Sequence, residues 1–466
     1  MSTPPNKSEW TPQTARTGDK PDRFSPKAFV YECWRTLMRH RLDNTGLTKS
    51  KIIFSNFFLH IQPVKVHRRS LKFATTGGLG LICLYLFLIL VVTGILLMFH
   101  YVPSVAKGPD GLPEAFSRML NLRSNIFWGT FIRNLHRWSA HGMVAVVFLH
   151  MLRVFLTGAY KSPRQFNWVI GCILAFLTLL LSYTGYLLPW DQLAYWGVKV
   201  GTEIARIAPG GALIRAILLG DHEVGGEALL RFYVLHVGLL PMVLSVGIGL
   251  HLWRVRKDGG LARPRLTSGE AQIPLAECGF AKNNSVYNNA RSYQLVEVVK
   301  GVEPKVDEEV DQMVFTWPKL IVRELIVFVL TLAIMCVVSV AFDAPLEPPA
   351  DPAFPPNPAK APWYFLGLQE MVSYNAFIGG VAIPGLLAGL FLLYPYIEMF
   401  VERLFRIKNR GGEGVWFARQ RWLENLFIIS IYVFMAILIL IGTYCRGPNW
   451  EFVTPFQQTE IHQGGH

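Results

Sequence analysis

The sequence predicts an all-α integral membrane protein with seven transmembrane helices. Of its 466 residues, 52% are hydrophobic and only 17% are charged, and the mean hydropathy is +0.32. Seven apolar stretches are long enough to cross a hydrocarbon core of about 30 Å, the second of them extended upstream by a polar segment. They lie near residues 79–99, 143–157, 168–188, 229–253, 320–342, 377–400 and 423–443.

The expected spans form a group of four and a group of three, separated by a polar stretch of about 60 residues. A second long connection, 343–376, is rich in proline and is expected to be an extended loop on the outer face. The expected parts are a basic N-terminal extension, a four-helix domain, a polar linker, a three-helix domain that includes this loop, and a tail. Their boundaries are 1–64, 65–256, 257–317, 318–445 and 446–466.

The formal net charge is +13, but the basic residues collect at alternate ends of the spans, which argues against a nucleic-acid surface. All the basic loops fall on one side if the spans alternate in direction. The positive-inside rule makes that side cytoplasmic, so we expect the N-terminus inside and the C-terminus outside. No apolar signal-peptide core occurs in the first 70 residues.

The six cysteines occur singly, with no CxxC and no CxxCH motif. This pattern gives no support to a disulfide framework, a cysteine-held iron–sulfur cluster or a c-type haem attachment.

Four histidines stand in two of the apolar stretches: His136 and His150 are 14 residues apart, and His236 and His251 are 15 apart. These steps correspond to roughly 21–22 Å, about four helical turns, so each pair stays near one face of its helix. Two such helices side by side would hold two stacked cofactors, each between two imidazoles. Haem iron suits such ligands.

Four glycines repeat the ligand spacing on the two spans of the first group that lack the histidines. Gly80 and Gly94 are 14 residues apart, as are Gly171 and Gly185. A glycine costs about 1 kcal/mol relative to alanine inside a helix, and close approach of a flat group or another backbone is its usual compensation. The glycines thus favour two macrocycles packed against bare backbone, while ordinary small-residue helix packing is the alternative.

Arginines flank the histidines. Arg133 lies one turn before His136, where a charge at membrane depth indicates a partner, for which haem propionates would be suitable. Arg153 follows His150 by three residues and would suit the other propionates or a quinone headgroup, although positive-inside flanking explains it equally well. His141 is off the ligand spacing and is expected to be a polar packing residue.

The sequence resembles a cytochrome b of the quinol-oxidising cytochrome bc family between about residues 65 and 445. It is most similar to a fused form of the photosynthetic version, in which the four-helix chain and its three-helix partner are separate. The segments that carry the resemblance are RNLHRWSA (133–140), LHMLRVFLTG (149–158), TGYLLPWDQ (184–192), RFYVLH (231–236) and PWYFL (362–366).

The resemblance implies two b-type haems. The outer, low-potential haem would be held by His136 and His236, and the inner, high-potential haem by His150 and His251. Span direction agrees with this assignment, because the second and fourth spans run the same way and their first histidines therefore share a level.

The resemblance also implies quinol oxidation at an outer site, transfer of one electron through the haems to an inner quinone site, and a contribution to the proton-motive force. The chain would be the core subunit of a quinol:cytochrome c oxidoreductase, or of one with a similar acceptor. Expected partners are a Rieske-type iron–sulfur protein, a c-type cytochrome and a second copy of the complex, in a bacterial inner membrane. The expected outer-site residues are Trp190, Asp191, Pro362, Trp363 and Tyr364.

Two features depart from the family pattern. The outer-site motif is commonly Pro-Glu-Trp-Tyr, in which the carboxylate accepts a quinol proton, but here Pro362 stands where that glutamate is expected. Glu370, eight residues further on, is within about 80° of Pro362 on a helix and is the expected substitute, although a solvated or interfacial carboxylate would look the same. The cysteine that attaches the extra inner haem of the photosynthetic version would fall near Gly78, so that haem is not expected.

Two other functions remain open. A di-haem membrane anchor could relay electrons between quinone and a separate catalytic subunit, but it would need only the first four spans. A non-redox transporter or scaffold would use its polar membrane residues to line a pathway.

Overall fold

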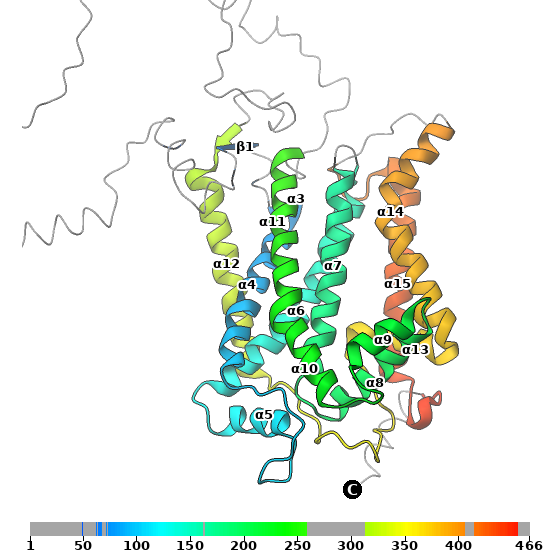
Figure 1. Cartoon of the computed structure of the whole chain (residues 1–466). Helices are drawn as coiled ribbons and strands as arrows, with labels where there is room; N and C mark the ends of the chain where they lie inside the picture. The colour runs from blue at the N-terminus through cyan, green and yellow to red at the C-terminus, as the bar shows by residue number, and fades with distance from the viewer. Residues whose placement is uncertain are drawn as a thin grey trace, which may run out of the picture.

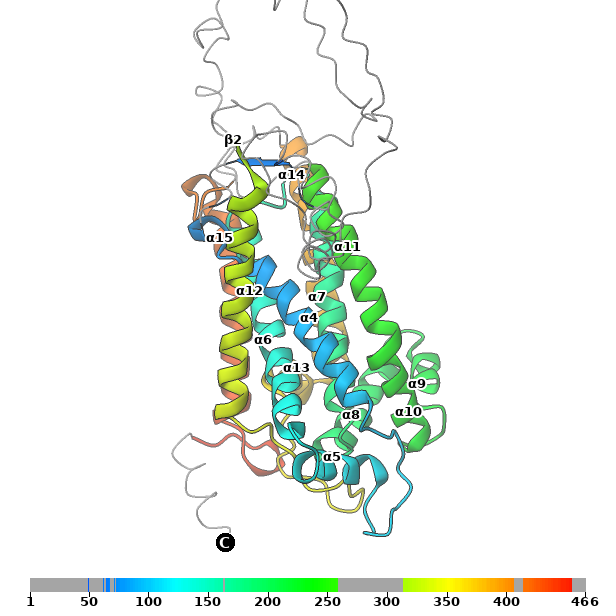
Figure 2. The ribbon, with the colours of Figure 1, turned by 90° about the vertical axis from the view of Figure 1, so that its left-hand side faces the viewer.

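The computed structural model describes residues 49, 62, 64–67, 71, 73–161, 164–258, 313–405 and 414–454. Seven helices in these residues are long and apolar enough to cross a membrane, as the sequence predicts. Figures 1 and 2 show them standing side by side in one bundle. The seven segments are Leu79–Met98, Gly129–Leu156, Gln165–Tyr186, Gly226–Arg256, Thr316–Ala341, Ile378–Glu402 and Arg419–Tyr444.

Shorter elements join these spans. The α-helices are α3 (Phe73–Thr76), α4 (Leu79–Met98), α5 (Glu114–Ser124), α6 (Gly129–Leu156), α7 (Gln165–Tyr186), α8 (Gln192–Ile207), α9 (Gly211–Leu219), α10 (Gly226–Val234), α11 (Leu240–Asp258), α12 (Thr316–Ala341), α13 (Trp363–Tyr374), α14 (Ile383–Leu404) and α15 (Trp422–Tyr444). The remaining elements are the strands β1 (Lys65–His67) and β2 (Met313–Phe315), the π-helical turns η3 (Leu235–Leu239) and η5 (Ile378–Ala382), and the 3₁₀ turns η6 (Arg419–Arg421) and η7 (Pro448–Trp450).

The two ends of the bundle differ. One end carries β1, which pairs antiparallel with β2 so that Lys65 lies opposite Phe315. The other end carries α5, α8, α9 and α13 (Figures 1 and 2). We refer to them as the β1 end and the α13 end. Because α6 and the fourth span, made of α10, η3 and α11, both start at the α13 end, His136 and His236 share a level near that end.

The first four spans form a layered bundle in which α4 packs on α6 and α7 packs on α11. The fifth span, α12, packs on both α4 and α6, and α13 packs on α15. Many apolar side chains on α12, α14 and α15 face outward, for example Val340 and Leu386, which are 77% and 72% exposed. An apolar exterior is what a helix in contact with lipid presents.

At the α13 end, side chains of α6 hold the segment that follows α12. Asn134 donates to Ser339 O and to Asp343 Oδ1, at 3.0 Å each, and accepts from Ala344 N at 2.9 Å. The indole of Trp138 donates to Phe342 O at 2.7 Å. These bonds satisfy carbonyls that the end of α12 leaves without a helical partner.

At the β1 end, Arg421 joins the start of α15 to the end of α6. This side chain is fully buried. Its guanidinium donates to Leu156 O at 3.1 Å and, from the other terminal nitrogen, to Phe155 O at 2.8 Å and Tyr160 Oη at 3.2 Å. Gly158 has a φ of +62°, and a Cβ built there would lie 2.6 Å from the guanidinium. The chain can turn around the arginine only with glycine at this position.

The expectation that 343–376 is an extended loop is wrong for its second half, because Trp363–Tyr374 forms α13. Pro362 ends the proline-rich stretch at the position immediately before the helix, where a fixed φ is compatible with helix initiation. The proposed extension 1–64 and linker 257–317 fall almost wholly outside the described residues.

Replacement of Arg421 by methionine is expected to lower the free energy of unfolding by about 3 kcal/mol, because buried acceptors lose a charged donor. The thermal unfolding midpoint of the detergent-solubilised protein measures this effect. Arg419→Met is the matched control, since Arg419 is exposed. Equal midpoints for the two variants would contradict the role assigned to Arg421.

Candidate haem and quinol site

The four histidines are each opposed by one of the four glycines. A Cβ built on Gly94 would lie 3.3 Å from Cε1 of His136, and one built on Gly185 would lie 2.6 Å from Cε1 of His236. Nearer the β1 end, a Cβ on Gly80 would lie 3.3 Å from Cε1 of His150, and one on Gly171 would lie 3.7 Å from Cε1 of His251. The equal spacing of glycines and histidines therefore reflects contact between neighbouring helices at two levels.

At the level nearer the α13 end, the rings of His136 and His236 are neighbours in an edge-on arrangement. Their centroids are 6.2 Å apart, and the ring planes are inclined by 78°. An imidazole–metal bond is about 2 Å long, so this separation fits one metal ion between the two rings. At the other level, His150 and His251 are close enough to interact electrostatically.

Threonines fix the tautomers of the first pair. Thr93 Oγ1 donates to Ile89 O at 2.7 Å, so its lone pair accepts from Nδ1 of His136 at 2.9 Å. Thr184 Oγ1 donates in the same way to Leu180 O and lies 3.1 Å from Nδ1 of His236. With the proton on Nδ1, the Nε2 lone pair of each ring is available for a metal.

At the second pair, Nδ1 of His150 is buried and has no hydrogen-bond partner, while Nδ1 of His251 is buried with only the backbone of Asn167 near its ring. A buried imidazole nitrogen without a partner is costly. The site is compatible with a flat macrocycle whose metal takes imidazole ligands. Three features support this: the buried ring nitrogens, the contact of each ring with bare glycine backbone, and the apolar bundle around them.

The two predicted arginines both lie at the expected levels. Arg133 donates to Ala344 O at 2.6 Å and to Pro345 O at 2.7 Å, so part of its guanidinium holds the segment after α12. Arg153 is 3% exposed, one turn beyond His150. Neither position tests the predicted contact with a propionate.

The predicted outer-site segments meet at the α13 end. Trp190 and Asp191 follow α7 and run antiparallel to the proline-rich segment, with Gln192 N donating to Pro348 O at 2.9 Å and Ala350 N donating to Trp190 O at 3.2 Å. Directly after Pro362, Trp363 and Tyr364 open α13, and the ring of the next residue, Phe365, lies 6.2 Å from that of Tyr186.

Asp191 caps α8. Its Oδ1 accepts from Ala194 N at 2.9 Å and its Oδ2 accepts from Glu347 N at 3.2 Å. Burial raises the pKa of Asp191 above the usual value, and the two backbone donors oppose that shift only in part. Both carboxylate oxygens are thus used in holding the outer segments together.

Glu370, the expected quinol base, is fully buried and bound on both oxygens. Arg446 Nη2 lies 2.5 Å from Oε1 and Arg446 Nε 3.1 Å from Oε2, while Tyr374 Oη donates to Oε1 at 3.0 Å and Trp450 Nε1 to Oε2 at 3.1 Å. The alternative of a solvated carboxylate is wrong. This geometry does not test the role of Glu370 as a base, which stays a prediction. The ion pair with Arg446 is by itself a sufficient reason for a glutamate at this buried position.

His141, expected to be a polar packing residue, lies beside the Pro-Trp-Tyr segment. Trp363 Nε1 is 3.0 Å from its Nδ1 and Arg137 Nε is 3.0 Å from its Nε2. The sequence contains one signal of this position, an additional histidine 5 residues after His136 that faces about 140° away from it on the helix.

Glu324 is a second residue that the sequence reasoning missed. It is a carboxylate inside the α12 span near the β1 end, and it accepts from Gln62 Nε2 at 2.9 Å. An ionisable side chain at membrane depth is itself a signal of function.

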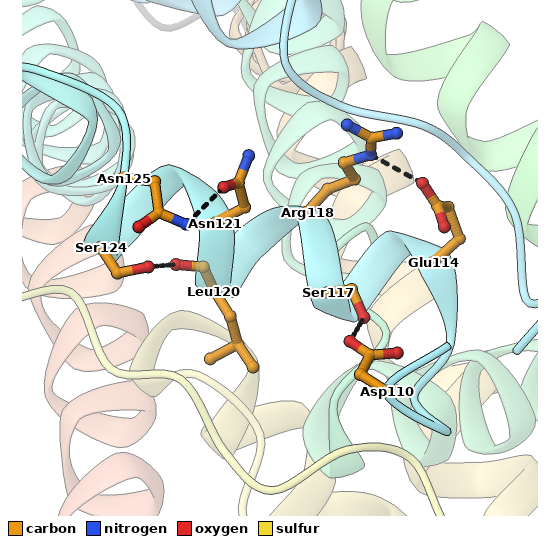
Figure 3. Close-up of a pocket in the computed structure, with 8 residues that line it drawn as sticks. All are labelled: Asp110, Glu114, Ser117, Arg118, Leu120, Asn121, Ser124 and Asn125. Carbon is orange, nitrogen blue, oxygen red and sulfur yellow. Dashed lines mark hydrogen bonds and ion pairs between the residues drawn. The ribbon is translucent and has the colours of Figure 1, made fainter. Parts of the chain in front are cut away.

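A surface cavity of about 340 Å³ on α5 contains none of these residues. Figure 3 shows its polar side chains bonded to their own neighbours, such as Arg118 to Glu114 at 2.7 Å and Asn125 to Asn121 at 2.7 Å. This internal pairing leaves no converging group for a ligand.

The bundle and its two levels of paired histidines define a class, that of multi-helix membrane cytochromes. The family described as cytochrome b (N-terminal)/b6/petB matches residues 141–349. A cytochrome b6 of Heliomicrobium gestii is 42% identical over 199 residues, which are 42% of this chain and 88% of that protein. The chain belongs to the cytochrome b/b6 family, whose members bind haem, and it is an integral membrane protein.

Two further comparisons extend into the three-helix part. A cytochrome bc complex cytochrome b subunit of Chlorobaculum thiosulfatiphilum is 30% identical over 327 residues, which are 69% of this chain and 65% of that protein. A chain of a solved structure named hyperthermophilic respiratory Complex III has a TM-score of 0.62 and 25% identity, with 94% of this chain and 92% of that chain covered.

Gly185→Ala is expected to reduce haem binding at His236 strongly, because the added methyl group would lie 2.6 Å from the ring. Gly171→Ala is the matched control, since its methyl group would make an ordinary 3.7 Å contact with His251. Haem per chain and the reduced-minus-oxidised spectrum measure the difference. Equal loss in both variants would contradict the tight fit at Gly185.

The Glu370–Arg446 pair gives a second expectation. Burial favours a higher pKa for Glu370, but the hydrogen bonds from Arg446 and Tyr374 outweigh it and hold the pKa below its usual 4.5. The pair's stabilisation is therefore present above about pH 4.5 and is lost as the pH falls through the folded-state pKa. Glu370→Gln should lower the unfolding midpoint at pH 7, and the difference from the unchanged protein should shrink below pH 4.5. A difference independent of pH would contradict the ion pair.

Proposed function

We propose that the chain is the di-haem cytochrome b subunit of a quinol-oxidising cytochrome bc-type complex. It would oxidise quinol near the α13 end and pass electrons through two b-type haems to a quinone site near the β1 end. The observation that carries the proposal is the contact of each histidine with its own glycine at two levels. The subunit would be active only within the complex, as a quinol:cytochrome c (or similar acceptor) oxidoreductase.

His136 and His236 would hold the haem nearer the α13 end, and His150 and His251 the other. Arg133 has donors beyond those that bind Ala344 and Pro345, since a guanidinium carries five N–H groups. It is proposed to pair with a propionate, and Arg153 with one of the second haem. The haems, when bound, supply one-electron redox centres at both levels.

The outer quinol site is proposed between the segment after α7 and the start of α13. Support comes from the antiparallel contact of Trp190 and Asp191 with the proline-rich segment and from the ring contact of Tyr186 with Phe365. A quinol ring suits such a surface, because offset and edge-on aromatic contacts stabilise flat rings.

The inner quinone site is proposed near Glu324. Glu324 is on α12, which lies close to the start of α4, because a Cβ on Gly78 would lie 3.8 Å from Val327. Two residues further on, Gly80 faces His150, so Glu324 is near the level of the second histidine pair. Glu324 and Gln62 would supply polar groups to a quinone headgroup, and the ring pair of Tyr85 and Phe328, 5.2 Å apart, would supply aromatic surface.

The β1 end is proposed to face the cytoplasm and the α13 end the outside of a bacterial inner membrane. The described basic residues at the β1 end support this orientation, and they include Lys161, Arg164, Arg254 and Arg256. A Rieske-type iron–sulfur protein, a c-type cytochrome and a second copy of the complex are the proposed partners. The division at 65–256, 257–317 and 318–445 is proposed as a fusion of the four-helix and three-helix parts.

His136→Ala and His236→Ala are each expected to remove the same haem, and His150→Ala and His251→Ala the other. The measurement is a redox-titrated optical spectrum of the purified complex with haem counted per chain, combined with quinol-dependent reduction of the haem. Removal of different haems by His136→Ala and His236→Ala would refute the ligand pairing. Two haems with no reduction by quinol would instead favour a membrane anchor for another catalytic subunit.

A further inference from the structure

The proton acceptor of the proposed outer site has to be a group whose lone pair can be freed. Both oxygens of Glu370 are bound by Arg446, Tyr374 and Trp450. Both oxygens of Asp191 are bound by backbone N–H groups. Burial raises the pKa of the Tyr364 phenol to about 12, so it keeps its proton at physiological pH.

His141 is a further candidate, and the two donors beside it compete for a single acceptor nitrogen. A neutral imidazole has one N–H group and one acceptor nitrogen. Here Nδ1 faces the indole N–H of Trp363 and Nε2 faces Nε–H of Arg137, each at 3.0 Å. Both neighbours only donate. At most one of these contacts can be a hydrogen bond, so one donor is exchangeable.

Trp363 is the more exchangeable of the two donors. It opens α13 and is 38% exposed, whereas Arg137 lies on α6 one turn from His141. A quinol hydroxyl in the position of the indole N–H would donate to Nδ1 of His141 and gain a bond that the indole makes only in competition with Arg137.

The rings around His141 also suit a quinol. Trp138 lies 5.4 Å away by ring centroid and Tyr364 5.5 Å away, with Trp363 a further 5.4 Å from Tyr364. These three aromatic side chains come from α6 and α13, so the two parts of the chain meet at His141.

The location fits electron transfer to the nearer histidine pair. His141 is five residues after His136, about 140° around α6 and roughly 7.5 Å along it. The histidine ligand and His141 are therefore on nearly opposite faces of one helix, whose full diameter is about 10–12 Å. A quinol at His141 would be separated from the haem-binding face by the thickness of α6.

We propose that His141 binds the quinol at the outer site and accepts its hydroxyl proton, in place of the glutamate that the Pro-Trp-Tyr segment lacks. The inference rests on the proposed function. A quinol O–H bond breaks and its proton forms an N–H bond at Nδ1 of His141. The quinol is oxidised to quinone, and its two electrons leave to the iron–sulfur partner and to the haem path of that proposal. The second proton leaves to the outer aqueous phase.

The test uses the purified complex with a short-chain benzoquinol and a naphthoquinol as alternative substrates. His141→Gln keeps a hydrogen-bond acceptor but takes no proton, and should slow quinol oxidation about 100-fold, within the usual range for loss of a general base. His141→Glu should recover most of the rate. His222→Gln, at an exposed histidine of the α9–α10 connection, is the matched control and should leave turnover unchanged.

The haem spectra and midpoint potentials should be unchanged in all three variants, which separates a positioning effect on His136 from loss of the base. Wild-type rates in His141→Gln would overturn the inference and leave the proposed function intact. Slowing in Glu370→Gln, with His141→Gln unaffected, would return the base role to Glu370. A wild-type complex that contains haem but is reduced by neither quinol would overturn both proposals.

Discussion

The close approach of a histidine ring to bare helix backbone is the constraint on which the four-helix bundle depends. A side chain at Gly94 or Gly185 would meet the ring of His136 or His236, so α4 and α7 can lie against the ligand-bearing helices only at glycine. Each glycine weakens its own helix by about 1 kcal/mol. That cost is compatible with folding because these helices pack side by side in an apolar bundle. The positions of the glycines along α4 and α7 therefore have to match the levels of the histidine rings, and this match also sets how closely the helices approach.

The three-helix part is joined to this bundle by polar side chains that bind carbonyl groups at helix ends. Asn134 and Trp138 bind the end of α12, and Arg421 binds the end of α6. In an apolar environment a carbonyl group without a hydrogen bond raises the free energy of the folded state. The four-helix and three-helix parts therefore dock in the one relative position in which these donors reach those carbonyl groups. In a single chain, this relative position also brings Trp363 to His141. The proposed outer site is therefore a product of docking and belongs to neither part alone.

The two carboxylates of the outer end both have structural roles. Glu370 holds Arg446 and thereby the segment after α15, and Asp191 caps α8 while binding the proline-rich segment. In both residues each carboxylate oxygen already accepts at least one fixed donor. An imidazole between two competing donors has the opposite property, because it can exchange one donor for another at small cost.

The sequence alone determined that the protein is an all-α membrane protein, where its seven spans lie, and that four histidines stand in pairs on two of them. These features follow from local composition and from the helical period of 3.6 residues. It also anticipated which glycines would matter, since spacing along one helix is preserved in space. It did not anticipate α13, for which the preceding prolines were misleading, or the partners of Glu370 and His141. Those depend on Arg446 and Trp363, which are 76 and 222 residues distant in the chain. Contacts of that range are fixed only when the helices pack, and only the tertiary structure could decide which polar group is bound and which is free to exchange its partner.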